Sequence, residues 1–139
     1  MPVVRADEQT VEEWRAGVRT RLIASAATGA KSLCVFEQWS EPGRGAPTHS
    51  HDDAEEVLVV LEGSAKIWVG DEASVLEGGG AVIVPAGVWH GFENVSDRIL
   101  HTLAAFADAA PLVSYADAPN EALRIGQVRT AQRNAVTST

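Results

Sequence analysis

Four side chains of the types that bind divalent metal ions occur close together in this 139-residue chain: His49, His51, Glu56 and His90. A β-strand directs alternate side chains to one face, so His49 and His51, two positions apart, would point to the same side of a strand. Three imidazoles and one carboxylate suit divalent iron, manganese, nickel, copper or zinc, and such a set leaves coordination positions open. The residue types and their spacing therefore predict one buried metal centre.

The carboxylate of this set is ambiguous from strand geometry. Glu56 lies five positions beyond His51, an odd step, so a continuous strand would turn Glu55 toward the histidines instead. The segment Asp52–Ala54 consists of poor strand formers, however, and a turn or bulge there would bring Glu56 round to the histidines. Both glutamates are therefore candidates, and the two aspartates argue for Glu56.

Glycine and proline residues frame the candidate ligands in two segments. The first segment runs Gly43, five residues, His49, one residue, His51, four residues, Glu56, six residues, Gly63. The second runs Gly79, five residues, Pro85, one residue, Gly87, two residues, His90, three residues, Asn94. Proline fixes one backbone angle and glycine tolerates positive φ, so 85–87 predicts a tight turn that places His90 at the head of a new strand. Both segments match the two sequence motifs of the cupin superfamily without a gap or a substitution, so the chain from Gly43 to Asn94 closely resembles a small single-domain cupin.

The resemblance implies an all-β fold, the double-sheet jelly-roll β-barrel of cupins. It also implies that His49, His51, Glu56 and His90 are the metal ligands, and its spacing selects Glu56 over Glu55. One divalent metal ion per chain is then expected, with iron or manganese favoured and zinc, nickel or copper as alternatives.

The implied chemistry follows from related sites. A site with three histidines and one glutamate resembles those of germins, oxalate-degrading cupins and quercetin dioxygenases. We therefore expect an oxygenase-type oxidoreductase acting on a small organic substrate that chelates the metal, with Glu56 also serving as a general base. The alternatives are a non-redox enzyme (isomerase, lyase or decarboxylase) and a binding module without turnover, because fold and metal do not choose among them.

Residue patterns outside the motifs agree with many short strands separated by glycine and proline. Val57–Leu61 is apolar at every position, which predicts a strand buried on both faces. The segment Thr10–Glu13 has the pattern of a capping box and predicts a short helix through Trp14. Pro111 and Pro119 predict an irregular C-terminal arm, which is expected to contain a short helix around 120–124 and to end in a frayed stretch at 134–139.

These elements are expected to form one domain with three parts. An N-terminal helix and first strand occupy 1–30, the barrel core occupies 31–107, and the partly irregular C-terminal arm occupies 108–139.

Strand alternation also predicts which side chains accompany the ligands into the barrel. Residues two and four positions beyond Glu56 and His90 share their faces, which gives a candidate substrate pocket of Leu58, Val60, Phe92 and Asn94. Such a mainly apolar lining favours a substrate with an aromatic or aliphatic body and a metal-chelating head.

Composition and net charge make some classes of binding partner poor candidates. The formal net charge of −8 repels phosphate backbones and anionic headgroups, so nucleic acid and membrane surfaces are poor candidates. The first residues lack the basic start and apolar core of a secretory signal. Cys34 is the single cysteine, so no internal disulfide can form, which fits a reducing compartment. We therefore expect a cytoplasmic protein whose partners are a small-molecule substrate and a second copy of itself in a homodimer.

Overall fold

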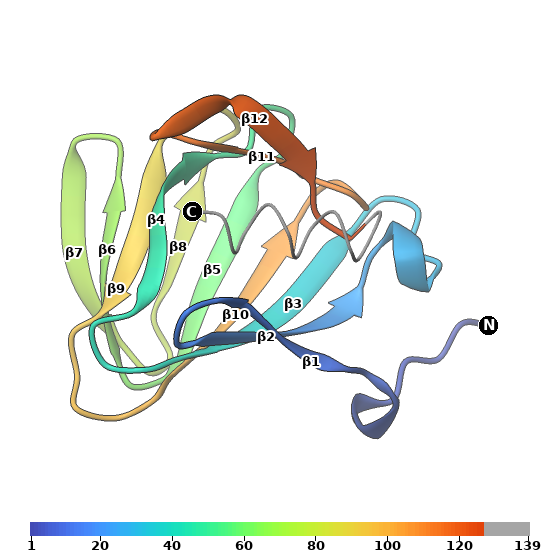
Figure 1. The fold of residues 1–139 in the computed structure, drawn as a ribbon, viewed down its shortest axis with the longest axis horizontal. Coiled ribbons are helices and arrows are strands. Elements are labelled where there is room, and N and C mark those ends of the chain that lie inside the picture. The colour runs from blue at the N-terminus through green and yellow to red at the C-terminus, as the bar shows by residue number, and fades with distance from the viewer. Residues whose placement is uncertain (127–139) are drawn as a thin grey trace.

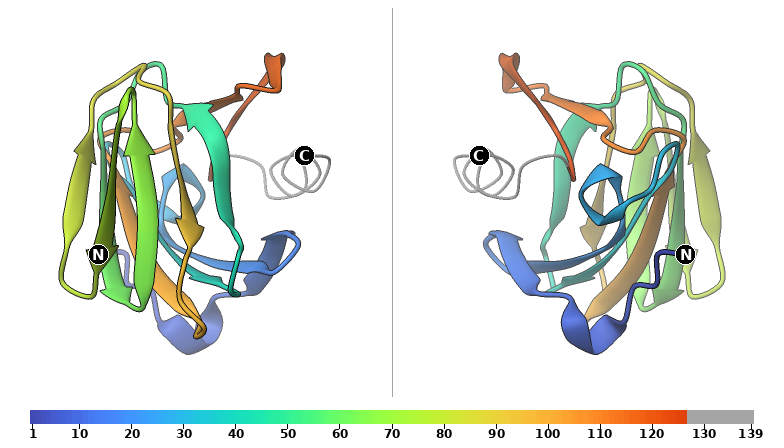
Figure 2. Two further views of the ribbon diagram at one scale, coloured as in Figure 1. Left: turned by 90° about the vertical axis from the view of Figure 1, so that its left-hand side faces the viewer. Right: turned by 90° about the vertical axis from the view of Figure 1, so that its right-hand side faces the viewer.

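The computed structural model describes residues 1–126, which form two facing antiparallel sheets of six strands each (Figure 1). The first sheet has the strand order β1-β2-β3-β10-β5-β8, and the second has the order β12-β11-β4-β9-β6-β7. Figure 2 shows these sheets as the two walls of a barrel. The strands are β1 Val11–Arg15, β2 Val18–Ala24, β3 Cys34–Ser40, β4 Gly45–Ser50, β5 Glu56–Glu62, β6 Ser64–Val69, β7 Glu72–Glu77, β8 Ala81–Val84, β9 His90–Asn94, β10 Leu100–Phe106, β11 Leu112–Tyr115 and β12 Ala118–Arg124. This is the predicted double-sheet jelly roll.

The turns that deliver the candidate ligands form where the sequence predicts them. Asp52 and Asp53 form a turn between β4 and β5. Ala86 and Gly87 form another turn before β9, with Gly87 at φ +80°, a conformation that residues with a side chain rarely adopt. In both cases two residues separate the turn from the candidate ligand that begins the next strand.

The predicted N-terminal helix is wrong. Its capping-box residues lie at the start of β1, which pairs with β2 through a hairpin, and the short 3-10 helix of this region, Ala6–Glu8, ends before them. A capping box is a local signal, and pairing with a neighbouring strand overrides it here because Val11 and Trp14 are good strand formers and Trp14 is buried.

The burial predicted for Val57–Leu61 is also wrong. Within β5, Leu58 and Val60 are buried, Val57 and Val59 are half-buried, and Leu61 is exposed. The strand therefore has one face in the core and one face on the outside of the barrel.

The C-terminal arm is more regular than predicted. Residues 112–124 form the antiparallel hairpin of β11 and β12, so the helix expected around 120–124 is wrong. Proline is tolerated at Pro119 because β12 is an edge strand, paired with β11 alone. This hairpin extends the second sheet across the top of the barrel in the view of Figure 1. The predicted frayed end at 134–139 lies outside the described residues.

The core lies between the sheets and is aromatic on one side of the metal-ligand cluster. Phe36 packs against Trp14 and Phe106, with ring centroids 5.3 Å and 5.4 Å apart.

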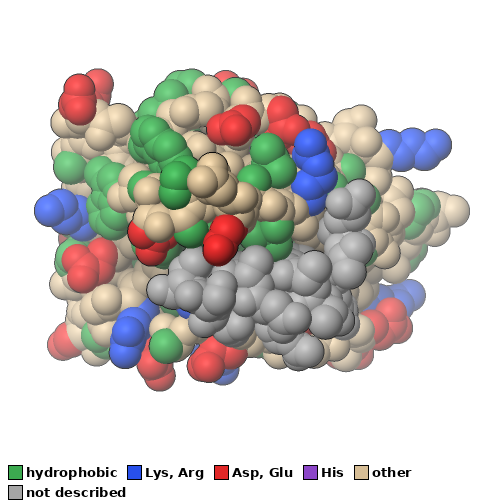
Figure 3. All heavy atoms as spheres, turned by 45° about the horizontal axis from the view of Figure 1, so that its top comes forward, with side chains coloured by type: hydrophobic (Ala, Val, Ile, Leu, Met, Phe, Trp, Pro, Cys, Tyr) green, Lys and Arg blue, Asp and Glu red, His purple; other side chains and the backbone are tan. Residues whose placement is uncertain are grey.

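On the face drawn in Figure 3, acidic, basic and hydrophobic side chains are interspersed rather than gathered by type. None of the helices in the described part of the chain has the length and apolar composition needed to cross a bilayer.

Candidate metal centre

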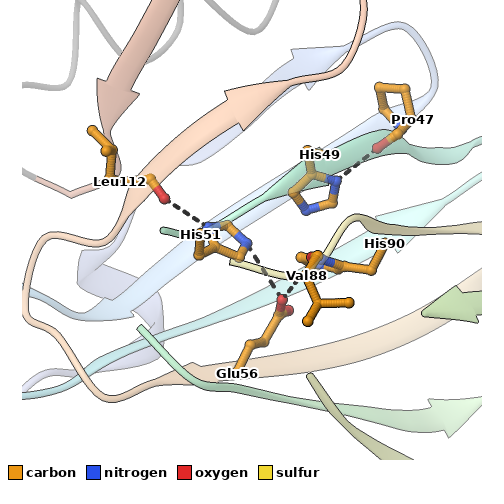
Figure 4. Close-up of polar contacts among 7 residues, drawn as sticks. All are labelled: Pro47, His49, His51, Glu56, Val88, His90 and Leu112. Carbon is orange, nitrogen blue, oxygen red and sulfur yellow. Dashed lines mark hydrogen bonds and ion pairs between the residues drawn. The ribbon is translucent and has the colours of Figure 1, made fainter. Parts of the chain in front are cut away.

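The four predicted ligands meet between the two sheets (Figure 4). His49 lies near the end of β4 and His90 begins β9, both in the second sheet, whereas Glu56 begins β5 in the first sheet. His51 follows β4 directly. One ligand atom from each residue lies within 4.8 Å of the others, and each residue is at most 9% exposed. The structure thus brings all four together in a buried cluster.

Strand pairing and the turn after β4 explain this convergence. His49 and His90 are paired residues on neighbouring strands β4 and β9, which fixes their spacing. The turn at Asp52–Asp53 resets the alternation, so that Glu56 faces inward and Glu55 is exposed. The geometry agrees with Glu56 as the member of the set and places Glu55 outside it.

Backbone carbonyl groups hold each histidine ring in one orientation (Figure 4). The Nδ1 atoms lie 2.6 Å from the Pro47 oxygen for His49, 2.9 Å from the Leu112 oxygen for His51, and 2.8 Å from the Val88 oxygen for His90. A carbonyl oxygen only accepts hydrogen bonds, so each Nδ1 donates its proton. In the neutral ring this leaves the Nε2 lone pair free, and such outer contacts typically fix the tautomer of metal-binding histidines.

The inward-facing atoms are all acceptors and need a cation among them. The Nε2 atoms of His90 and His51 lie 2.9 Å and 3.3 Å from Oε1 of Glu56. The second contact lacks the geometry of a hydrogen bond, which leaves the buried Nε2 of His51 without a hydrogen-bond partner in the described chain. Lone pairs that face one another in a buried site are stable only with a proton or a metal ion between them.

The pKa shifts of His49 and Glu56 favour the protonation states that bind metal ions. Burial lowers the pKa of His49 well below its ordinary value, and the neighbouring His90 and His51 lower it further, so His49 is neutral at pH 7. Burial acts to raise the pKa of Glu56, but the contacts with His51 and His90 outweigh burial and hold the pKa below its ordinary value. A neutral imidazole and an ionised carboxylate are the forms that bind metal ions.

The geometry fits a divalent metal ion. Metal–nitrogen and metal–oxygen bonds of about 2.1 Å place opposite donors about 4.2 Å apart, so a cluster spanning 4.8 Å needs only a small contraction. Four protein ligands leave room for further ligands at the metal.

A small cavity of about 30 Å³ adjoins the cluster. Of the predicted pocket residues, Leu58 and Phe92 line it. Val60 lies in the core and is not part of the lining. Asn94 is likewise outside the lining, and its side chain donates to the Ser40 and Arg98 carbonyl groups and accepts from Ser96, which makes it a turn-stabilising residue.

Two polar residues of the cavity escaped the sequence analysis, Arg15 and Tyr115. The ring of Tyr115 lies 5.9 Å from that of His49, centroid to centroid. Arg15 comes from β1 and Tyr115 from β11, two strands that the residue patterns do not predict. Their positions depend on long-range pairing, so no local pattern marks them.

Comparisons with known proteins agree with the fold. A family model described as a Cupin domain matches residues 38–106. An RmlC-like cupin from Shewanella frigidimarina NCIMB 400 aligns with TM-score 0.66 at 21% identity, over 76% of this chain and 88% of that one. An oxalate decarboxylase–formate complex from Lactobacillus farciminis aligns with TM-score 0.73 at 19% identity, over 80% of this chain and 34% of that one.

A recombinant oxalate oxidase in complex with glycolate aligns with TM-score 0.66 at 19% identity, over 71% of this chain and 55% of that one. No curated protein sequence matches. At these identities the structural likeness shows the fold alone. Together, the family model, the structural neighbours and the double-sheet jelly roll show that the chain belongs to the cupin superfamily.

Proposed function

We propose that this cupin is a metal-dependent enzyme, an oxygenase-type oxidoreductase that acts on a small organic substrate able to chelate the metal. The observation that carries the proposal is the convergence of three carbonyl-oriented histidines and Glu56 beside an internal cavity. Perturbed, buried ionisable groups beside a cavity are typical of functional sites, whereas a packed core has little use for them.

The ligand set supports one divalent metal ion per chain, with iron or manganese favoured and zinc, nickel or copper as alternatives. Such an ion would supply either redox chemistry with oxygen or Lewis-acid stabilisation of an enolate. The histidines would hold it through their Nε2 atoms, and the buried aromatic residues that line the cavity would limit the access of bulk water.

Glu56 is the candidate general base. It is the single carboxylate among the residues that line the cavity, so its oxygens are the carboxylate acceptors placed to take a proton from a bound substrate. A role in both metal binding and proton transfer requires that its contact with the metal be exchangeable.

Among the structural neighbours are an oxalate oxidase and an oxalate decarboxylase. The same fold therefore occurs with oxidative and with decarboxylating activity, and the non-redox alternative is tested in the same experiment.

The test is reconstitution of metal-free protein under anaerobic conditions with iron(II), manganese(II) or zinc(II), followed by exposure to air with a panel of small chelating acids, diketones and catechols. We expect oxygen consumption that depends on iron or manganese and on one class of substrate. Turnover with zinc and without oxygen would instead establish a non-redox enzyme. Metal binding without turnover of any compound would leave a binding module. The variant Glu56→Gln removes the candidate base and tests its role in turnover. Its matched control is Glu55→Gln, because Glu55 is exposed and adjacent.

A further inference from the structure

Arg15 lies in the cavity because of an irregularity in β1. The pairing of β1 with β2 shifts between Glu13 and Arg15, so that Trp14 is the extra residue of a β-bulge. In a regular strand Trp14 and Arg15 would point to opposite faces, but in this structure both line the cavity. Bulges re-aim side chains in this way and are frequent beside active sites.

The guanidinium group of Arg15 has unused donors. Its Nε and Nη1 atoms are buried and make no hydrogen bond to any residue in 1–126. The other partly buried arginine of the described chain differs, because Arg21 pairs with Glu37. A buried guanidinium is costly unless its charge and donors are matched, so an unmatched one indicates a missing anionic ligand.

The inner cavity supplies no such anion, and Glu93, which lines a neighbouring pocket together with Arg15, forms no ion pair with it. Glu56 is the single carboxylate of the cavity lining, and it is engaged by His51 and His90. Tyr115 is the residue whose charge bears on Arg15, but burial raises the pKa of Tyr115 and keeps its hydroxyl neutral. Arg15 is therefore the one fixed cation of the inner cavity lining, and Tyr115, whose ring lies near that of His49, offers a neutral hydroxyl.

We propose that Arg15 binds the carboxylate group of the substrate, so that the site takes a small carboxylic acid held between this guanidinium and the metal ligands. Arginine suits this role because its planar donors match the two oxygens of a carboxylate. This inference rests on the proposed function, since it places the ligand at the same centre.

The volume of the cavity limits the size of the acid that can bind beside the metal ligands. The cavity of about 30 Å³ holds only one or two water molecules, so it accepts a carboxylate head with few further atoms. An outer pocket of about 440 Å³ shares Arg15, Ala46 and Phe92 with the cavity lining, and a longer acid would extend past Arg15 into it. The aromatic or aliphatic substrate body expected from the sequence would therefore lie in the outer pocket rather than beside the ligands.

The test measures glycolate and glycolamide binding by isothermal titration calorimetry. These probes have nearly the same shape, but only glycolate carries the carboxylate. The full chain is titrated metal-free and loaded with manganese, as wild type, Arg15→Met, Arg15→Lys and the control Arg19→Met, which removes an exposed arginine from the same hairpin. We expect the wild type to prefer glycolate, Arg15→Met to lose at least about tenfold in glycolate affinity, and Arg19→Met to bind as the wild type does.

The unfolding midpoint of the metal-free protein separates binding from a structural role. Arg15→Met removes an unpaired buried charge, so its midpoint should equal or exceed that of the wild type. Glycolate should raise the midpoints of the wild type and of Arg19→Met, and it should leave that of Arg15→Met unchanged. Unchanged glycolate affinity in Arg15→Met, or no preference of the wild type for glycolate, would overturn the inference. If Arg15→Met does not fold, Arg15→Lys decides, since it keeps the charge, loses the planar donors and should bind glycolate more weakly than the wild type.

The metal content of the same samples keeps the two proposals apart. Wild-type protein that binds no metal contradicts the proposed function, whereas the metal-free titration still reports whether Arg15 recognises a carboxylate.

Discussion

At the scale of single residues, the histidines of the centre depend on the backbone rather than on other side chains. Each Nδ1 proton goes to a carbonyl oxygen, from Pro47, Leu112 or Val88. Carbonyl groups persist when side chains change, so the tautomer that exposes Nε2 is robust to most substitutions around the site. The ligands themselves are then the sensitive positions.

We expect His49→Ala and His90→Ala each to abolish stoichiometric metal binding, because each removes one nitrogen from a four-membered set. Metal content by inductively coupled plasma mass spectrometry measures this. Glu55→Ala is the control and should retain the metal, since Glu55 is exposed. Loss of metal in Glu55→Ala together with its retention in Glu56→Ala would show that the carboxylate is wrongly assigned.

Cys34 is expected to be unreactive in the folded protein. Burial, with smaller contributions from Asp108 and Glu56, raises the pKa of its thiol to about 12. At pH 8 the native protein should therefore not react with Ellman's reagent, and one thiol per chain should appear on unfolding in guanidinium. Rapid labelling of the native protein would contradict the buried position.

The same thiol makes stability fall at high pH. Its ordinary pKa is 9.0, so the unfolded chain releases this proton at a lower pH than the folded chain does. The free energy of unfolding should decrease as pH rises from 9 toward 12, by at most about 1.4 kcal/mol per pH unit from this group. Urea titrations of the wild type and Cys34→Ala isolate the effect, which should be missing in the variant.

At the scale of elements, the sequence predicts the strands that carry the metal ligands and misses two others that line the cavity, β1 and β11. The two turns at Asp52–Asp53 and Ala86–Gly87 are encoded by residues that favour turns, so the positions of Glu56 and His90 follow from local chemistry. The β1 strand follows from pairing with β2, a contact that a local pattern does not contain. The bulge that turns Arg15 inward depends on the same pairing, so no local sequence pattern predicts it.

Close approach between β4 and β9 makes Gly45 a sensitive position. A Cβ atom there would lie 2.1 Å from the Phe92 carbonyl oxygen and 3.0 Å from the Glu93 Cα, and both are backbone atoms with little freedom to move. Gly45→Ala should therefore separate the two strands that carry His49 and His90, lower the free energy of unfolding by more than about 3 kcal/mol and reduce metal content.

The control for this substitution is Gly43→Ala. Its Cβ would meet nothing within 4 Å, and only the positive φ of +77° opposes the change, at a cost of about 1–2 kcal/mol. Urea unfolding and metal analysis of both variants would show whether strand separation matters. Equal metal content in the two variants would contradict the explanation.

At the scale of the whole molecule, the outer face of the first sheet carries an apolar patch on β5 and β10, beside a charged cluster of Arg21, Glu37 and His101. Leu58, Val60 and Ala104 point into the core, so the alternate residues of β5 and β10 point outward. Val57, Val59 and Leu103 are half-buried on this outer side, and Val59 is paired with Leu103 across the strands. An exposed apolar patch of this kind, with charged groups at its edge, favours contact with another protein surface.

We propose that this face joins two copies of the chain in a homodimer. Light scattering coupled to size-exclusion chromatography should give twice the mass of one chain. Leu103→Glu should give the mass of a monomer, because it places a charge in the centre of the face. Val75→Glu on β7, at an exposed apolar residue of the other sheet, is the matched control and should leave the dimer intact. A wild-type monomer would contradict the proposal.

The bulged hairpin at the start of the chain lies outside residues 38–106, the part that matches the family model. The metal ligands lie within that part, whereas Arg15 and Tyr115 come from the flanking segments. In the proposed function, metal chemistry and acid recognition would therefore belong to separate stretches of the chain. Recombination that exchanges only the first hairpin could then change which acid is accepted while the metal ligands stay in place. Such an exchange is a route by which one scaffold could diversify and by which it could be engineered.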